Sequence, residues 1–402
     1  MSIRAAAAVR TCDACEATEG SAAHYVRRIL CEPRYREPNA RAIAEALGFC
    51  PAHAAFVAAF DEHAARIGAV TREALAIART LLRPHGREME ERLLEILFAA
   101  PNACPACRFK ESRLASFIAR RAAALRSRSR GGSRPHALCL PHFHALLGAS
   151  ELSDLSEWVA MEIDLLSDAQ AALEADGPGV LLAVTRWVAG RRSLPPMRGA
   201  SLATRCRVCL AARAAKARWL ALLRESMRTD AAPGMLLPLC GEHIWDCHST
   251  GDARLAAQAT RNALEVASRR LRKAAARLRE EEEQLELAKR SVWYKPKSAA
   301  YILGHRRRVI AGGSRCAACE RIAVACDRAV SELLEDQRGL RAREHECCMK
   351  HFACARVIAP AGATRESLTD AQLAALSGLE RELAAAPEAA WKQALGCFSG
   401  SI

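Results

Sequence analysis

Two kinds of metal-ligand pair alternate strictly along this 402-residue chain. A C-x2-C pair occurs four times, and each is followed by a C-x2-H pair, with 28 to 34 residues between the two pairs. At the Cys and His frequencies of the chain, the chance of one such match is on the order of one in a hundred, so four matches are not accidental. The pattern predicts four repeats of one small metal site, each pairing a C-x2-C with the C-x2-H that follows it.

Each expected site combines three cysteines with one histidine. Three thiolates and one neutral imidazole make a tetrahedral set that suits Zn²⁺ in a closed structural site, with no position left for a substrate. We therefore expect about four zinc ions per chain, with a role in folding rather than catalysis. The expected ligands are Cys12, Cys15, Cys50 and His53; Cys104, Cys107, Cys139 and His142; Cys206, Cys209, Cys240 and His243; and Cys316, Cys319, Cys348 and His351.

A helical apolar pattern follows the ligand pairs, as at 113–118 after Cys107 and at 54–57 after His53. Residues i and i+3 share a face of a helix, so two ligands at this spacing can hold one ion from the first turn. The partial positive charge at a helix N-terminus also lowers thiol pKa values. Each site is therefore expected to join the beginnings of two helices.

Cysteine is abundant, with 18 residues in the chain. The first fifteen residues contain no apolar core of a signal peptide, and the apolar stretch at 179–190 is too short to span a membrane. We expect a cytoplasmic protein that does not enter a membrane. Thiols stay reduced in that compartment, so metal binding explains the cysteines better than disulfides do, with buried structural cysteines as the plainer alternative.

The composition favours an all-α fold. The hydrophobic fraction of 51% can fill real cores, while aromatic residues make up only 5%, so helices packed through small residues are expected. The ligand repeat divides the chain into tandem helical modules. The expected segments are module one at 1–100, module two at 101–176, a Gly/Pro/Arg-rich linker at 177–203, module three at 204–250, a long charged helix with a basic connector at 251–310, and module four at 311–402.

The charged helix is expected over residues 252–290. Four leucines recur in it at seven-residue intervals, which is the spacing of a coiled-coil seam. These residues are Leu264, Leu271, Leu278 and Leu285. The seam predicts a partner helix, which is either an antiparallel helix of the same chain or a helix of a protein partner.

The chain is basic, with a formal net charge of +14. Ligand thiolates and zinc ions together would lower this value to about +10. Nucleic acid, either DNA or RNA, is the obvious polyanionic partner for the arginine clusters, and a solvated basic surface is the plainer alternative. The expected nucleic-acid-binding residues are Arg120, Arg121, Arg126, Arg128, Arg130, Arg306, Arg307 and Arg308.

Six cysteines lie outside the expected sites, and two of them are close to ligands in the sequence. Cys347 adjoins the ligand Cys348, and Cys354 lies one turn beyond His351. We expect these two thiols to be alternate ligands or redox-responsive groups of module four.

No catalytic motif is present. The chain contains no H-E-x-x-H, G-x-x-x-x-G-K-[ST], dinucleotide fingerprint or G-x-S-x-G, so neither an enzyme nor a small-molecule substrate is indicated. The preferred interpretation is a zinc-stabilised helical scaffold or adaptor that binds nucleic acid or a protein. The alternatives are an iron–sulfur electron carrier and a thiol-based redox or metal-handling protein.

Three segments carry a resemblance to a known family. They are Gly48-Phe49-Cys50-Pro51-Ala52-His53, Cys104-Pro105-Ala106-Cys107 and Leu138-Cys139-Leu140-Pro141-His142. They resemble a family of uncharacterised bacterial proteins that combine a C-P-x-C, a following helix and a G-x-C-x-x-H. Asp13, Arg207 and Ala317 stand where that family tends to have proline, so the likeness is best in the first half. The family has no established activity, so the resemblance implies the repeat and no particular function.

Overall fold

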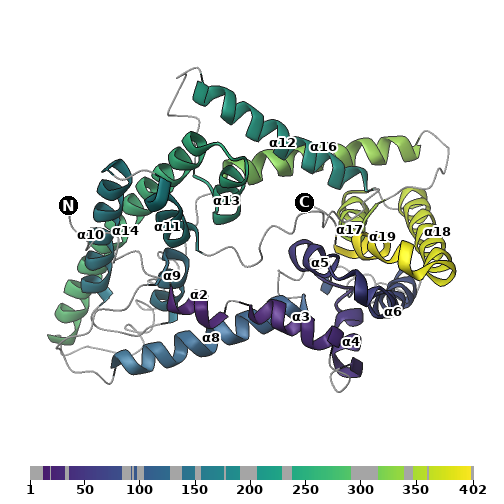
Figure 1. Cartoon of the computed structure of the whole chain (residues 1–402), viewed down its shortest axis with the longest axis horizontal. Helices are drawn as coiled ribbons and strands as arrows, with labels where there is room; N and C mark the ends of the chain where they lie inside the picture. The colour runs from purple at the N-terminus through teal and green to yellow at the C-terminus, as the bar shows by residue number, and fades with distance from the viewer. Residues whose placement is uncertain are drawn as a thin grey trace. The chain divides into compact units, whose positions relative to one another are not determined.

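All regular structure in the described part of the chain is helical. The computed structural model describes residues 12–18, 20–31, 36–83, 92, 95–96, 104–126, 138–149, 155–175, 178–190, 206–228, 238–290, 316–338, 347–359 and 362–399. Among these residues no strand occurs (Figure 1). The expected all-α fold with four Cys/His sites is confirmed. Within the same residues, no helix combines the length and the apolar character that crossing a membrane requires.

The chain forms two compact units, and each unit is assembled from three separate segments. Unit 1 consists of 1–19, 113–192 and 219–319, and unit 2 consists of 20–112, 193–218 and 320–402. The first and second halves of the chain therefore both contribute to each unit.

Unit 1 is organised around its longest helix. Its main helices are α2 (Asp13–Thr18), α9 (Leu140–Ala149), α10 (Leu155–Ala175), α11 (Pro178–Ala189), α13 (Gly241–Ser249) and α14 (Ala253–Arg290). Helix α14 packs against α10, α11 and α13. The side chain of Asp252 begins α14 by accepting hydrogen bonds from the backbone N–H groups of Arg254 and Leu255, at 3.0 and 3.1 Å.

The leucine seam of α14 is covered within the chain. Leu264, Leu271 and Leu278 are 1%, 2% and 3% exposed, and they share a core with Val159 and Leu166 of α10. The described part of the seam therefore packs against α10, a helix of the same chain. The side chain of Leu285 lies outside the described residues.

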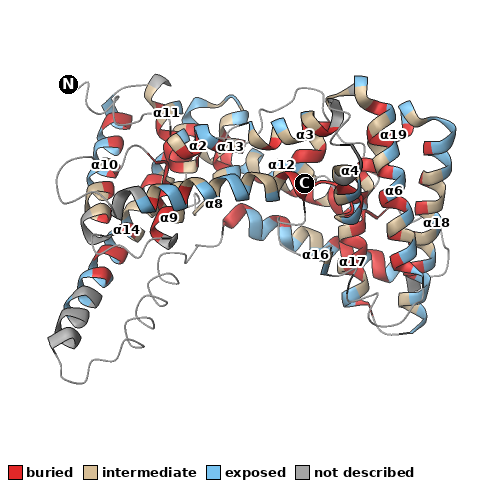
Figure 2. Ribbon diagram, turned by 90° about the horizontal axis from the view of Figure 1, so that it is seen from below, coloured by how far each residue is buried: buried red, intermediate tan, exposed pale blue. Residues whose placement is uncertain are grey.

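Unit 2 surrounds α6. Its helices are α3 (Ser21–Cys31), α4 (Arg36–Glu45), α5 (Pro51–Val57), the short η2 (Asp61–His63), α6 (Ala64–Leu82), α17 (Met349–Ile358), α18 (Ala363–Ala385) and α19 (Pro387–Ser399). Helix α6 packs against α4, α18 and α19, and buried residues lie along these helices (Figure 2). Trp391 and Phe398 are among the largest side chains in this core, and Arg79 pairs with Glu380 at its edge.

Three long helices carry the chain from one unit to the other. They are α8 (Pro105–Arg126), α12 (Arg207–Arg228) and α16 (Ala317–Arg338), with 22 residues each. Each begins beside a C-x2-C pair in one unit and ends in the other unit. A helix of this size is about 33 Å long, so its two ends are far apart.

Part of the linker expected at 177–203 is instead helix α11. Val184 and Trp187 are buried, and the indole N–H of Trp187 donates a hydrogen bond to the carbonyl of Leu138 at 3.0 Å. Proline starts a helix readily because its fixed φ suits the first turn, so Pro178 does not mark a break. Residues 191–203 of the expected linker lie outside the described residues.

Glu162 of α10 is a buried carboxyl group in unit 1, with 7% of its surface exposed. Its Oε1 atom has no hydrogen-bond partner among the described residues. Burial disfavours the charged form and raises the pKa of Glu162 to about 8. The folded protein therefore keeps this carboxyl group protonated at neutral pH.

We predict that Glu162→Gln stabilises the protein above neutral pH. Between the ordinary pKa of 4.5 and about 8, the unfolded chain loses this proton and the folded chain keeps it, so wild-type stability falls as pH rises. The glutamine amide of the variant carries no proton that titrates in this range, so its stability does not fall in this way. Denaturant unfolding should give the variant an advantage on the order of 1–3 kcal/mol at about pH 8 and none near pH 4. Asp164→Asn, on the exposed side of α10, is the control. Equal advantages at both pH values would contradict the prediction.

Candidate metal sites

Four clusters, each of three cysteines and one histidine, contain all sixteen expected ligands. In each cluster the four ligand atoms lie within 4.8 Å of one another, so each could hold a metal ion. Site I consists of Cys12, Cys15, Cys139 and His142; site II of Cys50, His53, Cys104 and Cys107; site III of Cys206, Cys209, Cys348 and His351; and site IV of Cys240, His243, Cys316 and Cys319. Sites I and IV belong to unit 1, and sites II and III belong to unit 2.

The combination of ligand pairs differs from the expected one. No C-x2-C meets the C-x2-H that follows it: modules one and two exchange partners, and modules three and four do the same. Site II is therefore nested within the chain segment that site I closes, and site IV is nested within the segment that site III closes. The expectation of one site per consecutive module is wrong, and each half of the chain instead contains one site inside another.

The length of the helices after three of the four C-x2-C pairs, α8, α12 and α16, accounts for the exchange. Helix α16 carries the chain about 33 Å away from its ligand pair. The next C-x2-H begins at Cys348, ten residues after the helix ends at Arg338. Ten residues span about 34 Å at full extension, so a return to the same pair would require an almost straight run back along the helix. Pairing with the ligands of another module avoids this strained connection.

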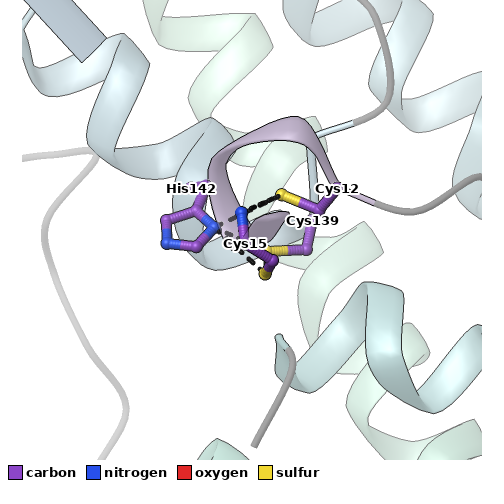
Figure 3. Close-up of side chains that lie close together, drawn as sticks. All are labelled: Cys12, Cys15, Cys139 and His142. Carbon is purple, nitrogen blue, oxygen red and sulfur yellow. Dashed lines mark hydrogen bonds between the residues drawn. The ribbon is translucent and has the colours of Figure 1, made fainter. Parts of the chain in front are cut away.

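Site I shows the arrangement of the four side chains (Figure 3). The Nδ1 atom of His142 lies 3.3, 3.4 and 3.1 Å from the sulfurs of Cys12, Cys15 and Cys139. The sulfurs of Cys15 and Cys139 are 3.7 Å apart. The three sulfurs and one nitrogen thus face a common centre, with the other ring nitrogen of His142 directed away from it.

The other three sites repeat this geometry. The histidine Nδ1 to sulfur distances are 3.1–3.6 Å in site II, 3.1–3.4 Å in site III and 3.1–3.5 Å in site IV. One pair of sulfurs across each of these sites is 3.7, 3.7 and 3.9 Å apart in turn. All four sites therefore share one arrangement of three sulfurs around a histidine nitrogen.

Every ligand pair lies at the beginning of a helix, as expected. The first cysteine of a pair precedes the helix, and its carbonyl accepts an early helical hydrogen bond, as in Cys50 to Ala54 and Cys348 to Phe352. The second ligand is in the first turn. In site I the backbone N–H of Cys15 also donates to the sulfur of Cys12 at 3.4 Å. The unpaired N–H groups at these helix ends favour negatively charged sulfur.

The thiols of each site together give up one proton readily. Hydrogen bonds from neighbouring thiols hold the pKa of Cys12, Cys104 and Cys206 far below the ordinary range. In site IV a hydrogen bond with Cys240 lowers the pKa of Cys316 to about 3. Conversely, hydrogen bonding with Cys316 and burial raise the pKa of Cys240. Without a cation, the negative charge of the first thiolate opposes the ionisation of the other two cysteines of the site. A bound cation would favour the thiolate form of all three.

The sites differ in their exposure. All four residues of site III are buried, whereas Cys319 of site IV is exposed and Cys240 is half-buried. Site IV is consequently the most accessible to a chelator, and site III is the least accessible.

The expected basic residues are only partly described. Arg120 is exposed and Arg121 half-buried on α8. The side chain of Arg126 lies outside the described residues, as do the remaining members of the set, Arg128, Arg130, Arg306, Arg307 and Arg308. Sequence reasoning missed a row of exposed arginines on α14, although the helical spacing of these arginines could have revealed it.

Comparison with known protein families, curated proteins and solved structures finds no match. The resemblance to an uncharacterised bacterial family therefore stays a prediction from the sequence.

We predict that mild oxidation of the metal-free folded protein cross-links cysteines across the exchanged pairing. The expected disulfides join sulfurs that lie 3.7–3.9 Å apart across the four sites, namely Cys15 with Cys139, Cys50 with Cys107, Cys209 with Cys348, and Cys240 with Cys319. Peptide mapping by mass spectrometry identifies them. The unfolded chain is the control, because proximity in sequence should then favour disulfides within each C-x2-C. Cross-links from each C-x2-C to the next C-x2-H in the folded sample would overturn the exchanged pairing.

Proposed function

We propose that each of the four sites binds one Zn²⁺ ion and that the chain is a non-catalytic, zinc-stabilised helical scaffold. The observation that carries this proposal is the common geometry of the four clusters. With Zn–S of about 2.3 Å and Zn–N of about 2.0–2.1 Å, a tetrahedron has edges of about 3.8 Å between sulfurs and about 3.5 Å between sulfur and nitrogen. The sulfur pairs in sites I, II and III, at 3.7 Å, and the nitrogen–sulfur distances of 3.1–3.6 Å are close to these edges.

The compactness of the sites favours a single ion over an iron–sulfur cluster. A cluster places two or more irons and bridging sulfides between its ligands, and so holds some of them farther apart than one ion does. The four ligand atoms in every site lie within 4.8 Å of one another. This spacing supports Zn²⁺ as the resident ion and makes the iron–sulfur carrier the weaker alternative.

The composition of the sites supports a structural role. Four protein ligands fill a tetrahedral zinc ion, which leaves no position for water or substrate. The ligands lie at the beginnings of helices that belong to separate chain segments, so a bound ion fastens these segments to one another. The free energy of binding would then contribute directly to folding.

Elemental analysis of gently purified protein should find four zinc ions per chain, one for each cluster. Cys319→Ala should reduce the content to three, because site IV is then left with three protein ligands, whereas a structural zinc site uses four. Cys354→Ala removes a thiol that belongs to no cluster and is the matched control, with four ions retained. A chelator should empty the exposed site IV first and lower the helical circular dichroism signal. Brown protein containing iron and sulfide, or fewer than two zinc ions, would contradict the proposal.

We also propose that the scaffold binds nucleic acid through the exposed face of α14. Arg254, Arg261, Arg272 and Arg279 are exposed and recur at intervals of 7, 11 and 7 residues, which places them in one row along the helix. At 3.6 residues per turn, the row lies about a quarter of a turn away from the buried leucine seam. Such a row offers positive charge along one line, which can neutralise phosphates of a nucleic-acid backbone. Glu265 lies on the same side, but it pairs with Arg269 at 3.5 Å.

Replacing these four arginines by glutamine should weaken binding of a labelled DNA duplex and flatten its salt dependence. The slope of log affinity against log salt should fall by about 0.9 for each phosphate that the variant no longer neutralises. The control removes the same charge from four exposed arginines scattered over other helices, Arg218, Arg321, Arg328 and Arg381. Equal changes in both variants, or no salt-sensitive binding by the wild type, would contradict the proposal.

A further inference from the structure

Extra cysteines gather around site III. The side chain of Cys347 hydrogen-bonds to the ligand Cys206, and the side chain of Cys326 hydrogen-bonds to the ligand His351. Cys397 packs against the same core, where burial and the charge of the nearby Cys206 raise the pKa of its thiol. More thiols therefore surround this one centre than the three that a site of three cysteines and one histidine uses.

Cys347 occupies a position that is apolar in the other three sites. The residue before the first cysteine of the C-x2-H is Phe49 in site II, Leu138 in site I and Leu239 in site IV. Phe49 and Leu138 are buried at 8% and 5% exposure, and Cys347 is buried at 8%. A residue that only fills the core would have a hydrocarbon side chain here, as in the other three sites. Cys347 instead places a sulfur beside the sulfur of the ligand Cys206.

We propose that Cys347 is a fifth ligand of site III, which can replace His351 and complete an all-thiolate set with Cys206, Cys209 and Cys348. This inference rests on the proposed metal occupancy of the sites. It assigns to site III a second coordination state, open to thiophilic ions such as Cd²⁺ that prefer sulfur to nitrogen.

The local backbone suits an exchange of ligands. Cys347 precedes α17, and the N-cap residue Cys348 has an extended backbone conformation. Neither residue is therefore part of the helix. The side-chain amide of Gln372 donates to the carbonyl of Cys347 at 3.2 Å and holds that segment in place. The exchange requires the Cys347 side chain to turn toward the centre that Cys206, Cys209 and Cys348 share.

The test compares four single variants of the full chain, His53→Ala, His142→Ala, His243→Ala and His351→Ala. Zinc content is measured after dialysis against a chelator that leaves the wild type fully loaded. The first three variants should each lose one ion, whereas His351→Ala should keep all four. Adding Cys347→Ala to His351→Ala should then remove one. A loss of one ion by His351→Ala, in a chain whose wild type holds four, would overturn the inference, whereas a wild type with fewer ions would instead refute the proposed function.

Cadmium NMR gives a second measurement that does not depend on removing a histidine. The fully Cd²⁺-loaded wild type should show three resonances at the position of three-sulfur, one-nitrogen sites and one shifted toward that of four-sulfur sites. Cys347→Ala should return the fourth resonance to the first group. Cys247→Ala is the matched control, because Cys247 is also buried and lies near a ligand, Cys316 of site IV. A wild-type spectrum with all resonances in the first group would overturn the inference.

Discussion

The fold depends on the meeting of helix beginnings at the four Cys/His sites. Helix α8 shows why. Its side chains between Arg108 and Phe117 are exposed or half-buried, and Ile118 is the first buried residue after its ligand pair. Such a helix has little apolar surface with which to fix its own position. Its ligand pair, held in site II, anchors the end that packing does not.

The free energies of loop closure and of metal binding differ greatly in their contribution to stability. Joining Cys15 to Cys139 closes a loop of 124 residues, and prior closure of site II shortens the effective loop to about 67 residues. This difference is worth only about 0.5 kcal/mol of chain entropy. A structural zinc ion contributes about 10–16 kcal/mol in small peptides. The nesting therefore matters less for loop entropy than for bringing both halves of the chain into each unit.

The sequence was sufficient to predict the ligands and the helices that they begin, because metal ligation and the first turn of a helix are both local. The α14 helix was predictable for the same reason, from the spacing of Leu264, Leu271 and Leu278.

Which C-x2-C shares a site with which C-x2-H was not predictable, since all four C-x2-C pairs are chemically equivalent and every C-x2-H fits any of them. Geometry at long range decides among them: α8, α12 and α16 are rigid over 22 residues and direct the chain away. Helix α11 was missed because Pro178 and Gly179 resemble a linker until Trp187 is seen to be buried.

The exchanged pairing also sets an order of events during synthesis. The ribosome releases the chain from its N-terminus, so Cys12 and Cys15 leave it together with Cys50 and His53, long before Cys139 exists. The first complete set of ligands to emerge is consequently a non-native one. A newly made chain must either keep its first thiols free of metal until the second module appears or release an ion that it has already captured. For this protein, the rate at which metal leaves a wrong site is thus part of the folding problem.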